Sequence, residues 1–273
     1  MGTALVTGAT SGIGLELVWQ LAAARHDLVL VARDHQRLAV LAEDLHQVAG
    51  VSAQVLPADL STAQGRQKVA QRLLRTEATG ARSARGPRTA QEVARRPVDL
   101  LVNNAGFGLG QAFVGGDVDR ERRALEVMVG AVMELSHAAL PGMVERGHGA
   151  VLNIASLASL TAMGTYAAHK AWVRTFTEGL ATELKGTGVS ATVVCPGLTR
   201  TEFHERAHME DVWPSLVWTD AQEVARQALD AVRRGQVICT PTLRYQAAAA
   251  LLRLSPRWLV RRVAGHASSA TRY

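Results

Sequence analysis

Tyr166 and Lys170 are the two residues whose types and spacing point most directly to chemistry. They enclose the segment Tyr166-Ala167-Ala168-His169-Lys170, and on a helix a separation of four places both side chains on one face. A phenol has an ordinary pKa of about 10, but a neighbouring ammonium group favours the phenolate and lowers that pKa. We therefore predict that Tyr166 is an acid/base that gives a proton to a carbonyl oxygen or takes one from an alcohol. We interpret His169, which points elsewhere on the helix, as structural.

Ser156 is the expected partner of Tyr166, because it ends the apolar segment 151–156. If this segment is a strand of an open α/β sheet, its carboxyl end faces the ligand crevice, where a hydroxyl can donate a hydrogen bond to a substrate oxygen. Ser159 is an alternative, but it falls in the following loop. The predicted catalytic group is therefore Ser156, Tyr166 and Lys170.

A glycine-rich turn, Thr7-Gly8-Ala9-Thr10-Ser11-Gly12-Ile13-Gly14, follows the first apolar run of the chain. Gly8 permits a tight turn, Gly12 lets the backbone approach a pyrophosphate, and Gly14 allows a helix to pack closely on a strand. The helix that begins here offers free N–H groups to phosphates. This context of strand, turn and helix is typical of a dinucleotide site. The predicted contacts in the turn are Gly8, Thr10, Ser11, Gly12, Ile13 and Gly14.

Arg33 ends the second apolar run and bears on the choice between NAD and NADP. An acidic residue at this point accepts hydrogen bonds from the adenosine ribose and repels a 2′-phosphate, whereas an arginine can bind that phosphate through two charged hydrogen bonds. Asp34 comes one position later and is expected to cap the next helix. The sequence therefore favours NADP(H) over NAD(H), with an exposed arginine at a helix start as the alternative interpretation of Arg33.

Apolar runs alternate with helical patterns along the chain, and this alternation predicts the fold. Continuous apolar runs are typical of strands buried on both faces, and intervening helices impose parallel pairing. The expected strands are 4–6, 28–31, 53–56, 100–102, 151–154, 191–194 and 237–239. The expected helices include 15–24, 34–48, 62–75, 118–140, 166–185 and 220–234. We predict a single α/β domain, with a doubly wound Rossmann-type parallel sheet of about seven strands.

The spacing Gly-x-x-x-Gly-x-Gly, together with Tyr-x-x-x-Lys, resembles the short-chain dehydrogenases/reductases over nearly the whole chain. The resemblance implies an NAD(P)-dependent oxidoreductase that transfers a hydride between nicotinamide and a carbonyl or alcohol. It also implies that Lys170 holds the nicotinamide ribose, as well as lowering the phenol pKa. The family commonly forms dimers and tetramers, so the resemblance implies a homo-oligomer.

Further cofactor contacts follow from this resemblance. It implies that Asp59 accepts a hydrogen bond from the adenine amino group, although an aspartate at a strand end also caps helices. The segment 103–106 would hold the central sheet together and line the adenine ribose, and the backbone of the Pro196–Gly197 turn would contact the nicotinamide carboxamide. The contacts so implied are Asp59, Leu60, Asn104, Ala105, Gly106, Pro196, Gly197 and Thr201.

Two departures from the family pattern concern catalysis. Met128 aligns with the position where the family commonly has a catalytic asparagine that kinks the helix and supports a water relay. A thioether is a weak acceptor and cannot replace an amide in such a relay. In addition, Tyr166 follows Ser156 by fewer residues than is usual. These departures keep open an alternative function, an NADP(H)-binding regulatory or scaffold protein whose active site has decayed.

The net charge of +6 lies in two places. The stretch 72–96 holds seven arginines and the chain after Asp230 holds eight and no acidic residue, while the remainder is acidic. This is not the basic face of a nucleic-acid-binding fold, so no nucleic-acid partner is expected. No export signal opens the sequence, and Cys195 and Cys239 are interpreted as free thiols. We therefore expect a cytoplasmic protein, and we assign no metal ligands.

The expected organisation is one catalytic domain over 1–243 and a basic, apolar C-terminal extension over 244–273. Within the domain, 76–96 are interpreted as a surface insertion with a short helix near 89–95, and 198–218 as a lid over the substrate. The apolar residues of that lid favour a predominantly apolar small-molecule substrate. The extension is expected to pack on its own domain or on a second subunit, and contact with an anionic membrane surface is the less favoured alternative.

Overall fold

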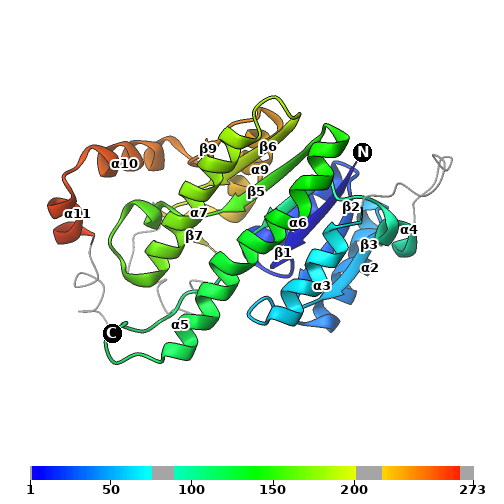
Figure 1. Ribbon diagram of the computed structural model, residues 1–273, viewed down its shortest axis with the longest axis horizontal. Coiled ribbons are helices and arrows are strands. Elements are labelled where there is room, and N and C mark those ends of the chain that lie inside the picture. Colours follow the sequence, from blue (N-terminus) through cyan, green and yellow to red (C-terminus); the bar gives the residue numbers. More distant parts are fainter. Residues whose placement is uncertain (1, 76–88, 201–216, 265–273) are drawn as a thin grey trace.

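Seven parallel strands form the centre of the molecule, as the apolar runs predicted (Figure 1). The structure is a computed structural model, and it describes residues 2–75, 89–200 and 217–264. The sheet order is β3-β2-β1-β4-β5-β6-β9. The strands are β1 (Thr3–Thr7), β2 (Asp27–Ala32), β3 (Ala53–Pro57), β4 (Leu100–Asn103), β5 (Gly149–Ile154), β6 (Val189–Val194) and β9 (Ile238–Cys239). A separate short pair, β7 (Thr199–Arg200) and β8 (Thr219–Asp220), lies outside this sheet.

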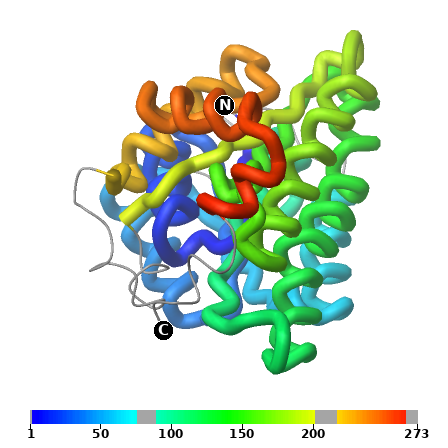
Figure 2. Tube along the Cα trace, turned by 90° about the vertical axis from the view of Figure 1, so that its left-hand side faces the viewer, coloured from blue at the N-terminus to red at the C-terminus, as the bar shows by residue number. Residues whose placement is uncertain are grey.

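Helices cover both faces of the sheet, as expected for strands that are apolar on both sides. One face carries α1 (Gly12–Ala23), α2 (His35–Ala49) and α9 (Ala221–Arg233). The other carries α3 (Ala63–Leu73), α4 (Ala90–Arg95), α6 (Ala131–Arg146) and α7 (Gly164–Glu183), of which α6 and α7 run together on the right of Figure 2. Each leucine or valine buried in these two layers contributes about 1.5–3 kcal/mol to stability. The doubly wound prediction is therefore confirmed.

The order of the strands determines where a ligand can bind. The chain builds outward from β1 to β2 and β3, then returns to β4 on the other side of β1. The loops that leave β1 and β4 therefore diverge, and a crevice opens at the carboxyl ends of these two strands. The glycine-rich turn after β1 and the segment after β4 meet at this point.

The long helical segment α5 (Val118–Leu125), η1 (Glu126–Gly130) and α6 crosses one face of the sheet. By length and composition alone, Val118–Arg146 is apolar enough to span a membrane. More than half of its apolar window is buried inside the fold, and α6 packs against α3. The apolar character of this segment is therefore that of a core helix.

The short helix expected near 89–95 is α4, and Val93 in it is fully buried. Arg72 donates a hydrogen bond to the carbonyl of Val93 (2.8 Å), and Arg96 pairs with Asp27 on β2 (3.1 Å). The second part of the stretch interpreted as an insertion is thus packed on the sheet. Residues 76–88 lie outside the described residues.

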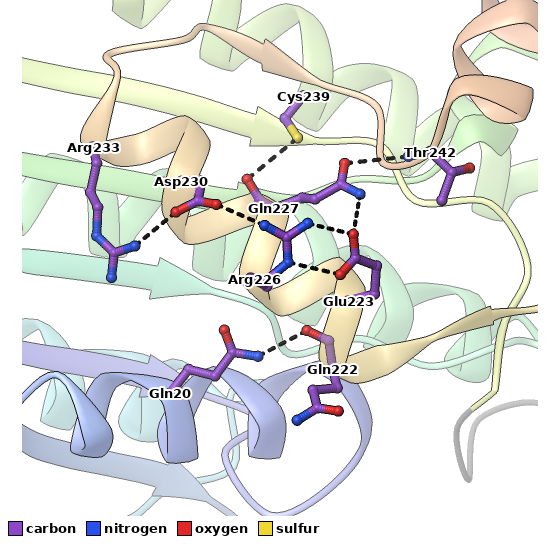
Figure 3. A network of polar contacts seen from close by, with 9 residues as sticks. All are labelled: Gln20, Gln222, Glu223, Arg226, Gln227, Asp230, Arg233, Cys239 and Thr242. Carbon is purple, nitrogen blue, oxygen red and sulfur yellow. Dashed lines mark hydrogen bonds and ion pairs between the residues drawn. The ribbon is translucent and has the colours of Figure 1, made fainter.

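Helix α9 fixes the start of the C-terminal extension. The side chain of Gln227 accepts a hydrogen bond from the N–H of Thr242 (3.3 Å) and donates one to Glu223 (2.6 Å) (Figure 3). Thr242 has a left-handed φ of +69°, which is costly for a β-branched residue. Gln227 therefore holds the chain at the turn where β9 leads into α10 (Leu243–Leu254), which is followed by α11 (Arg257–Val263).

Candidate active site

The crevice is closed at its base by hydrogen bonds between the ends of β1 and β4. The Thr7 hydroxyl accepts hydrogen bonds from the N–H groups of Asn104 (2.9 Å) and Ala105 (3.1 Å). The Asn104 amide donates in return to the carbonyls of Thr7 (3.0 Å) and Gly8 (3.2 Å). Because these bonds join two loops that are far apart in sequence, they position the glycine-rich turn relative to Ala105 and Gly106.

Asn103, which precedes Asn104, joins the neighbouring strands. Its amide donates to Asn153 on β5 (2.9 Å) and to Ser136 on α6 (3.2 Å), and Asn153 donates to Thr177 on α7 (2.8 Å). All of these polar groups are buried and paired, so they cross-link the sheet to the helices above it. The two adjacent asparagines thus hold the sheet together in the way the resemblance implied.

The glycine-rich turn has the geometry that a phosphate site needs. Gly8 and Gly12 have φ values of +66° and +53°, which L-residues with a side chain rarely adopt. A Cβ on Gly14 would lie 2.2 Å from the Gly8 carbonyl oxygen, so α1 could not otherwise pack so closely. No side chain caps α1 at Ser11 and its first turn holds no acidic residue, so its N–H groups and positive dipole end are available to an anion. Thr10, Ser11, Gly12 and Ile13 are all partly exposed beside them.

Arg33 is exposed just beyond the end of β2, and Asp34 caps α2 by accepting the N–H of Arg37 (3.0 Å). Arg37 was not predicted, but its guanidinium donates to the Thr10 carbonyl (2.8 Å) in the glycine-rich turn. It lies one helical turn after Arg33, and that spacing is the signal by which the sequence could have revealed it. The structure thus joins the first turn of α2 to the glycine-rich turn through Arg37.

Asp59, beyond the end of β3, is bound by both the N–H and the hydroxyl of Ser61 (2.9 and 2.8 Å). Burial acts to raise the pKa of Asp59, but the hydrogen bonds from Ser61 and the nearby charge of Arg33 outweigh it and lower the pKa. Asp59 is therefore an ionised acceptor close to Arg33. Leu60 beside it is buried in the core, so its side chain does not line the crevice.

The predicted catalytic residues converge despite the short sequence spacing between them. Ser156 lies directly after β5, and it accepts the N–H of Ala158 (3.1 Å) where η2 (Leu157–Leu160) begins. A side-chain hydrogen bond joins Ser156 to Tyr166 near the start of α7. Ser159 is instead buried beside the Cys195 thiol. The structure therefore pairs Ser156, and not Ser159, with the phenol.

Lys170 is buried on the same face of α7 as Tyr166, with its Nζ 5.8 Å from the centre of the phenol ring. The ammonium group donates a hydrogen bond to the carbonyl of Ile154 at the end of β5 (2.8 Å). It also lies close to Gly106, where an added Cβ would be 3.5 Å from Nζ. Lys170 thus sits at the ends of β4 and β5, beneath the mouth of the crevice.

The pKa of Tyr166 differs from the sequence expectation. Burial raises it to about 12, and the hydrogen bond with Ser156 only partly opposes this effect. Burial also lowers the pKa of Lys170 to about 8. The expected lowering of the phenol pKa by the ammonium group is therefore wrong for the protein without a cofactor. The reason is that the loss of hydration on burial dominates at both groups.

Met128 is fully buried in η1, a π-helical turn inside the long helix. Its thioether lies beside Gly106, close to Lys170, and it packs in one cluster with Leu109 and Tyr166. Single π-turns are frequent at functional sites, so the widening of the helix is present here without the asparagine that the family commonly uses. The methionine fills this space but offers no polar relay to Lys170.

Tyr245 is the second residue near the crevice that was not predicted. Its ring covers Gly197, where an added Cβ would lie 2.0 Å from the ring, while Pro196 is buried beside it. Its hydroxyl accepts the N–H of Leu198 (3.0 Å) and donates to the carbonyl of Val217. Tyr245 thus joins the two ends of the segment predicted as a lid. No sequence signal could link it to Leu198, because the two are 47 residues apart.

Most of the segment predicted as a lid, residues 201–216, lies outside the described residues. The predicted cofactor contact Thr201 is one of these residues.

Replacing Tyr245 with phenylalanine is expected to lower the free energy of unfolding by about 1–3 kcal/mol, because the Leu198 N–H loses its acceptor. Urea unfolding followed by circular dichroism measures this change. An unchanged unfolding midpoint would mean that the hydroxyl contributes nothing to holding the two segment ends.

Comparison with known proteins agrees with this geometry. The chain matches the family described as short chain dehydrogenase over residues 2–79 and 83–211. It is 34% identical over 230 residues to sulfoacetaldehyde reductase 2 of Chromohalobacter salexigens, covering 82% of this chain and 79% of that protein. It is 32% identical over 198 residues to the ketoacyl reductase HetN of a Nostoc species, covering 71% of this chain and 62% of that protein.

The solved structure of a short-chain dehydrogenase from Sphingobium yanoikuyae in complex with NADPH superposes with a TM-score of 0.79. It is 32% identical, and the match covers 93% of this chain and 94% of that one. The chain therefore belongs to the short-chain dehydrogenase/reductase family and is an NAD(P)-dependent oxidoreductase.

Proposed function

We propose that the protein uses NADP(H) to reduce the carbonyl group of a predominantly apolar small molecule. The observation that carries this proposal is the convergence of Ser156, Tyr166 and Lys170 at the carboxyl end of β5. The uncapped start of α1 fits a pyrophosphate at the other side of the same crevice. Both halves of a hydride-transfer site are thus present on one edge of the sheet.

The mechanism follows from the protonation states of Tyr166 and Lys170. A bound nicotinamide cofactor would supply the hydride to the carbonyl carbon. Tyr166, whose pKa is raised to about 12, holds its proton at neutral pH and gives it to the carbonyl oxygen as that oxygen gains charge. Ser156 donates a hydrogen bond to the same oxygen and keeps it in line with the phenol. Water then returns a proton to Tyr166.

A protonated phenol favours reduction over alcohol oxidation. Oxidation needs Tyr166 as a base, and in the protein without a cofactor burial favours the protonated phenol. Lys170 stabilises the phenolate that forms after proton transfer. We infer that it also holds the nicotinamide ribose, and its closeness to Gly106 supports this role.

The apolar character of the substrate is inferred from the surroundings of Tyr166. Leu109 and Met128 are buried in one cluster, against which Phe107 and the phenol ring pack. Apolar side chains beside the phenol favour apolar groups next to the reacting carbonyl.

Arg33 supports the preference for NADP(H). We expect Arg33→Ser to weaken NADPH binding by about tenfold to a hundredfold, because charge-assisted hydrogen bonds to the 2′-phosphate are lost. The affinity for NADH, which lacks that phosphate, is expected to change little. Fluorescence titration of both cofactors measures the two affinities. Equal losses for NADPH and NADH would contradict the assignment of Arg33 to the phosphate.

The activity should also depend on the charge of Lys170. Because burial lowers the pKa of Lys170 to about 8, the ammonium charge is present below pH 8 and is lost as the pH rises through that value. We expect kcat/KM for NADPH-dependent reduction to be level below pH 8 and to fall by about tenfold per pH unit above it.

Lys170→Arg provides the control for this profile, because a guanidinium keeps its charge throughout the range. The Lys170→Arg variant can be slower than the wild type, but its kcat/KM should not fall above pH 8. A wild-type profile that stays level to pH 10 would show that the ammonium charge is not required.

A regulatory or scaffold protein with a decayed active site is the second candidate, and Met128 in place of the family's asparagine is the observation that favours it. The two functions are separated by following NADPH absorbance against a panel of ketones and aldehydes of increasing apolar size. Turnover of any of these compounds supports the enzyme. Tight NADPH binding without turnover on the whole panel would favour the second candidate.

A further inference from the structure

Both helices of the C-terminal extension contact the domain. Helix α10 buries Ala249 and α11 buries Val260. Arg257 donates a hydrogen bond to the carbonyl of Leu160 (3.1 Å), and the N–H of Ala162 donates to the carbonyl of Ala264 (3.2 Å). These contacts place the two helices against the loop between Ser156 and Tyr166, at the left-hand edge of the molecule in Figure 1.

The opposite face of α10 is an apolar stripe that nothing in the described part of the chain covers. Leu243, Leu251 and Leu254 are 82%, 68% and 86% exposed, and the exposed Ala247 and Ala250 lie between them. Their spacing of three, four or seven residues places them on one side of the helix. A surface helix of a soluble domain normally turns charged or polar residues outward. The outward stripe on α10 is therefore built to contact something other than water.

The charge around this stripe has one sign. Arg261 and Arg262 on α11 are exposed, and Trp258 on the same helix is 59% exposed. No acidic residue follows Asp230 in the sequence, so no neighbouring side chain of the extension neutralises these arginines. The outward face thus combines leucines, a tryptophan and positive charge that no acidic residue of the extension offsets.

An anionic lipid surface complements every one of these features. Leucine side chains enter the acyl boundary, tryptophan prefers the headgroup level, and arginines bind lipid phosphates. A second copy of the chain fits less well, because a twofold interface would place two sets of these arginines in one contact, and no acidic residue of the extension would offset them. We propose that the outward face of α10 and α11, formed by Leu243, Leu251, Leu254, Trp258, Arg261 and Arg262, docks the protein on anionic membranes.

Vesicle flotation tests this surface with the full chain. Vesicles of phosphatidylcholine mixed with phosphatidylglycerol should carry the protein upward at low salt, whereas pure phosphatidylcholine vesicles should carry much less. The double variant Arg261→Gln, Arg262→Gln is expected to weaken binding to the anionic vesicles by about thirtyfold, from two surface charges. Leu251→Gln with Leu254→Gln should weaken it to a similar degree.

Matched controls are available on other faces of the molecule. Val48→Gln replaces an apolar side chain on α2 that is also largely exposed, and Arg122→Gln with Arg123→Gln removes two exposed charges on α5. Neither control should change vesicle binding. NADPH affinity, measured for every variant, shows that each one is folded.

Two outcomes would overturn the proposal. The first is equal or absent binding to both kinds of vesicle. The second is a wild-type protein that forms a dimer and does not bind vesicles. If the double variant Leu251→Gln, Leu254→Gln is then a monomer, the face contacts a second copy of the chain. Because flotation needs neither cofactor nor substrate, its result does not depend on whether the proposed reductase activity is found.

Discussion

Tyr166→Phe is expected to lower kcat/KM for NADPH-dependent carbonyl reduction by a factor of about 10²–10⁴, the usual contribution of a positioned acid/base. The substitution removes only the hydroxyl, so the ring can still pack beside Leu109 and Met128. NADPH affinity should change little, because the phosphates are bound at the other side of the crevice. Stopped-flow measurement of a single turnover, with NADPH binding measured on the same sample, separates the two effects.

Ser159→Ala is the matched control for this prediction. It also removes one hydroxyl from the loop region, but Ser159 is buried beside Cys195 and does not pair with the phenol. It should therefore keep most of the activity, whereas Ser156→Ala should lose part of it. A Tyr166→Phe protein that reduces its substrate at the wild-type rate would remove the basis of the proposed mechanism.

Gly14→Ala is expected to abolish detectable NADPH binding and to lower the free energy of unfolding by about 1–3 kcal/mol, the range for overpacking a tight site. The added Cβ would lie 2.2 Å from the Gly8 carbonyl oxygen and 2.4 Å from the Asn104 amide nitrogen. Neither atom is the end of a long flexible side chain, and Asn104 is tied to the turn by its own hydrogen bonds. The turn must therefore shift, and the N–H groups of α1 shift with it.

Gly179→Ala on α7 is the control for this substitution. A Cβ on Gly179 meets nothing within 4 Å, so the change should leave NADPH binding intact. It should also stabilise the helix by about 0.5–1 kcal/mol, because alanine restricts the unfolded chain more than glycine does. Urea unfolding and NADPH titration of both variants provide the comparison. If Gly14→Ala binds NADPH as well as Gly179→Ala does and is equally stable, then the turn does not need a glycine at position 14 for close packing.

The sheet was predictable because its signals are local. A parallel strand buried on both faces must be apolar along its length, so the run Leu28–Val31 could be identified as β2 without any partner in view. The glycine-rich turn is similarly local, since Gly8, Gly12 and Gly14 are constrained by neighbouring backbone. The fold and the family therefore followed from short stretches of sequence.

The contacts that complete the site were not predictable in the same way. Tyr245 reaches Leu198 from a helix that comes much later in the chain. Such a contact depends on how the elements pack and leaves no periodic pattern, whereas Arg37, which contacts Thr10 from α2, lies at a helical spacing from Arg33. The π-turn at Met128 was also missed, because its residues read as an ordinary apolar helix.

By itself, the sequence determined the strand–helix alternation, the parallel doubly wound sheet and the membership of Tyr166 and Lys170 in one helix face. Each depends on side-chain type and on spacing within a single element. Only the tertiary structure decided the protonation of that pair and the outward exposure of the apolar stripe on α10. The physical reason is that hydration, which sets both the pKa of a buried group and the exposure of a leucine, depends on what the rest of the fold places around it.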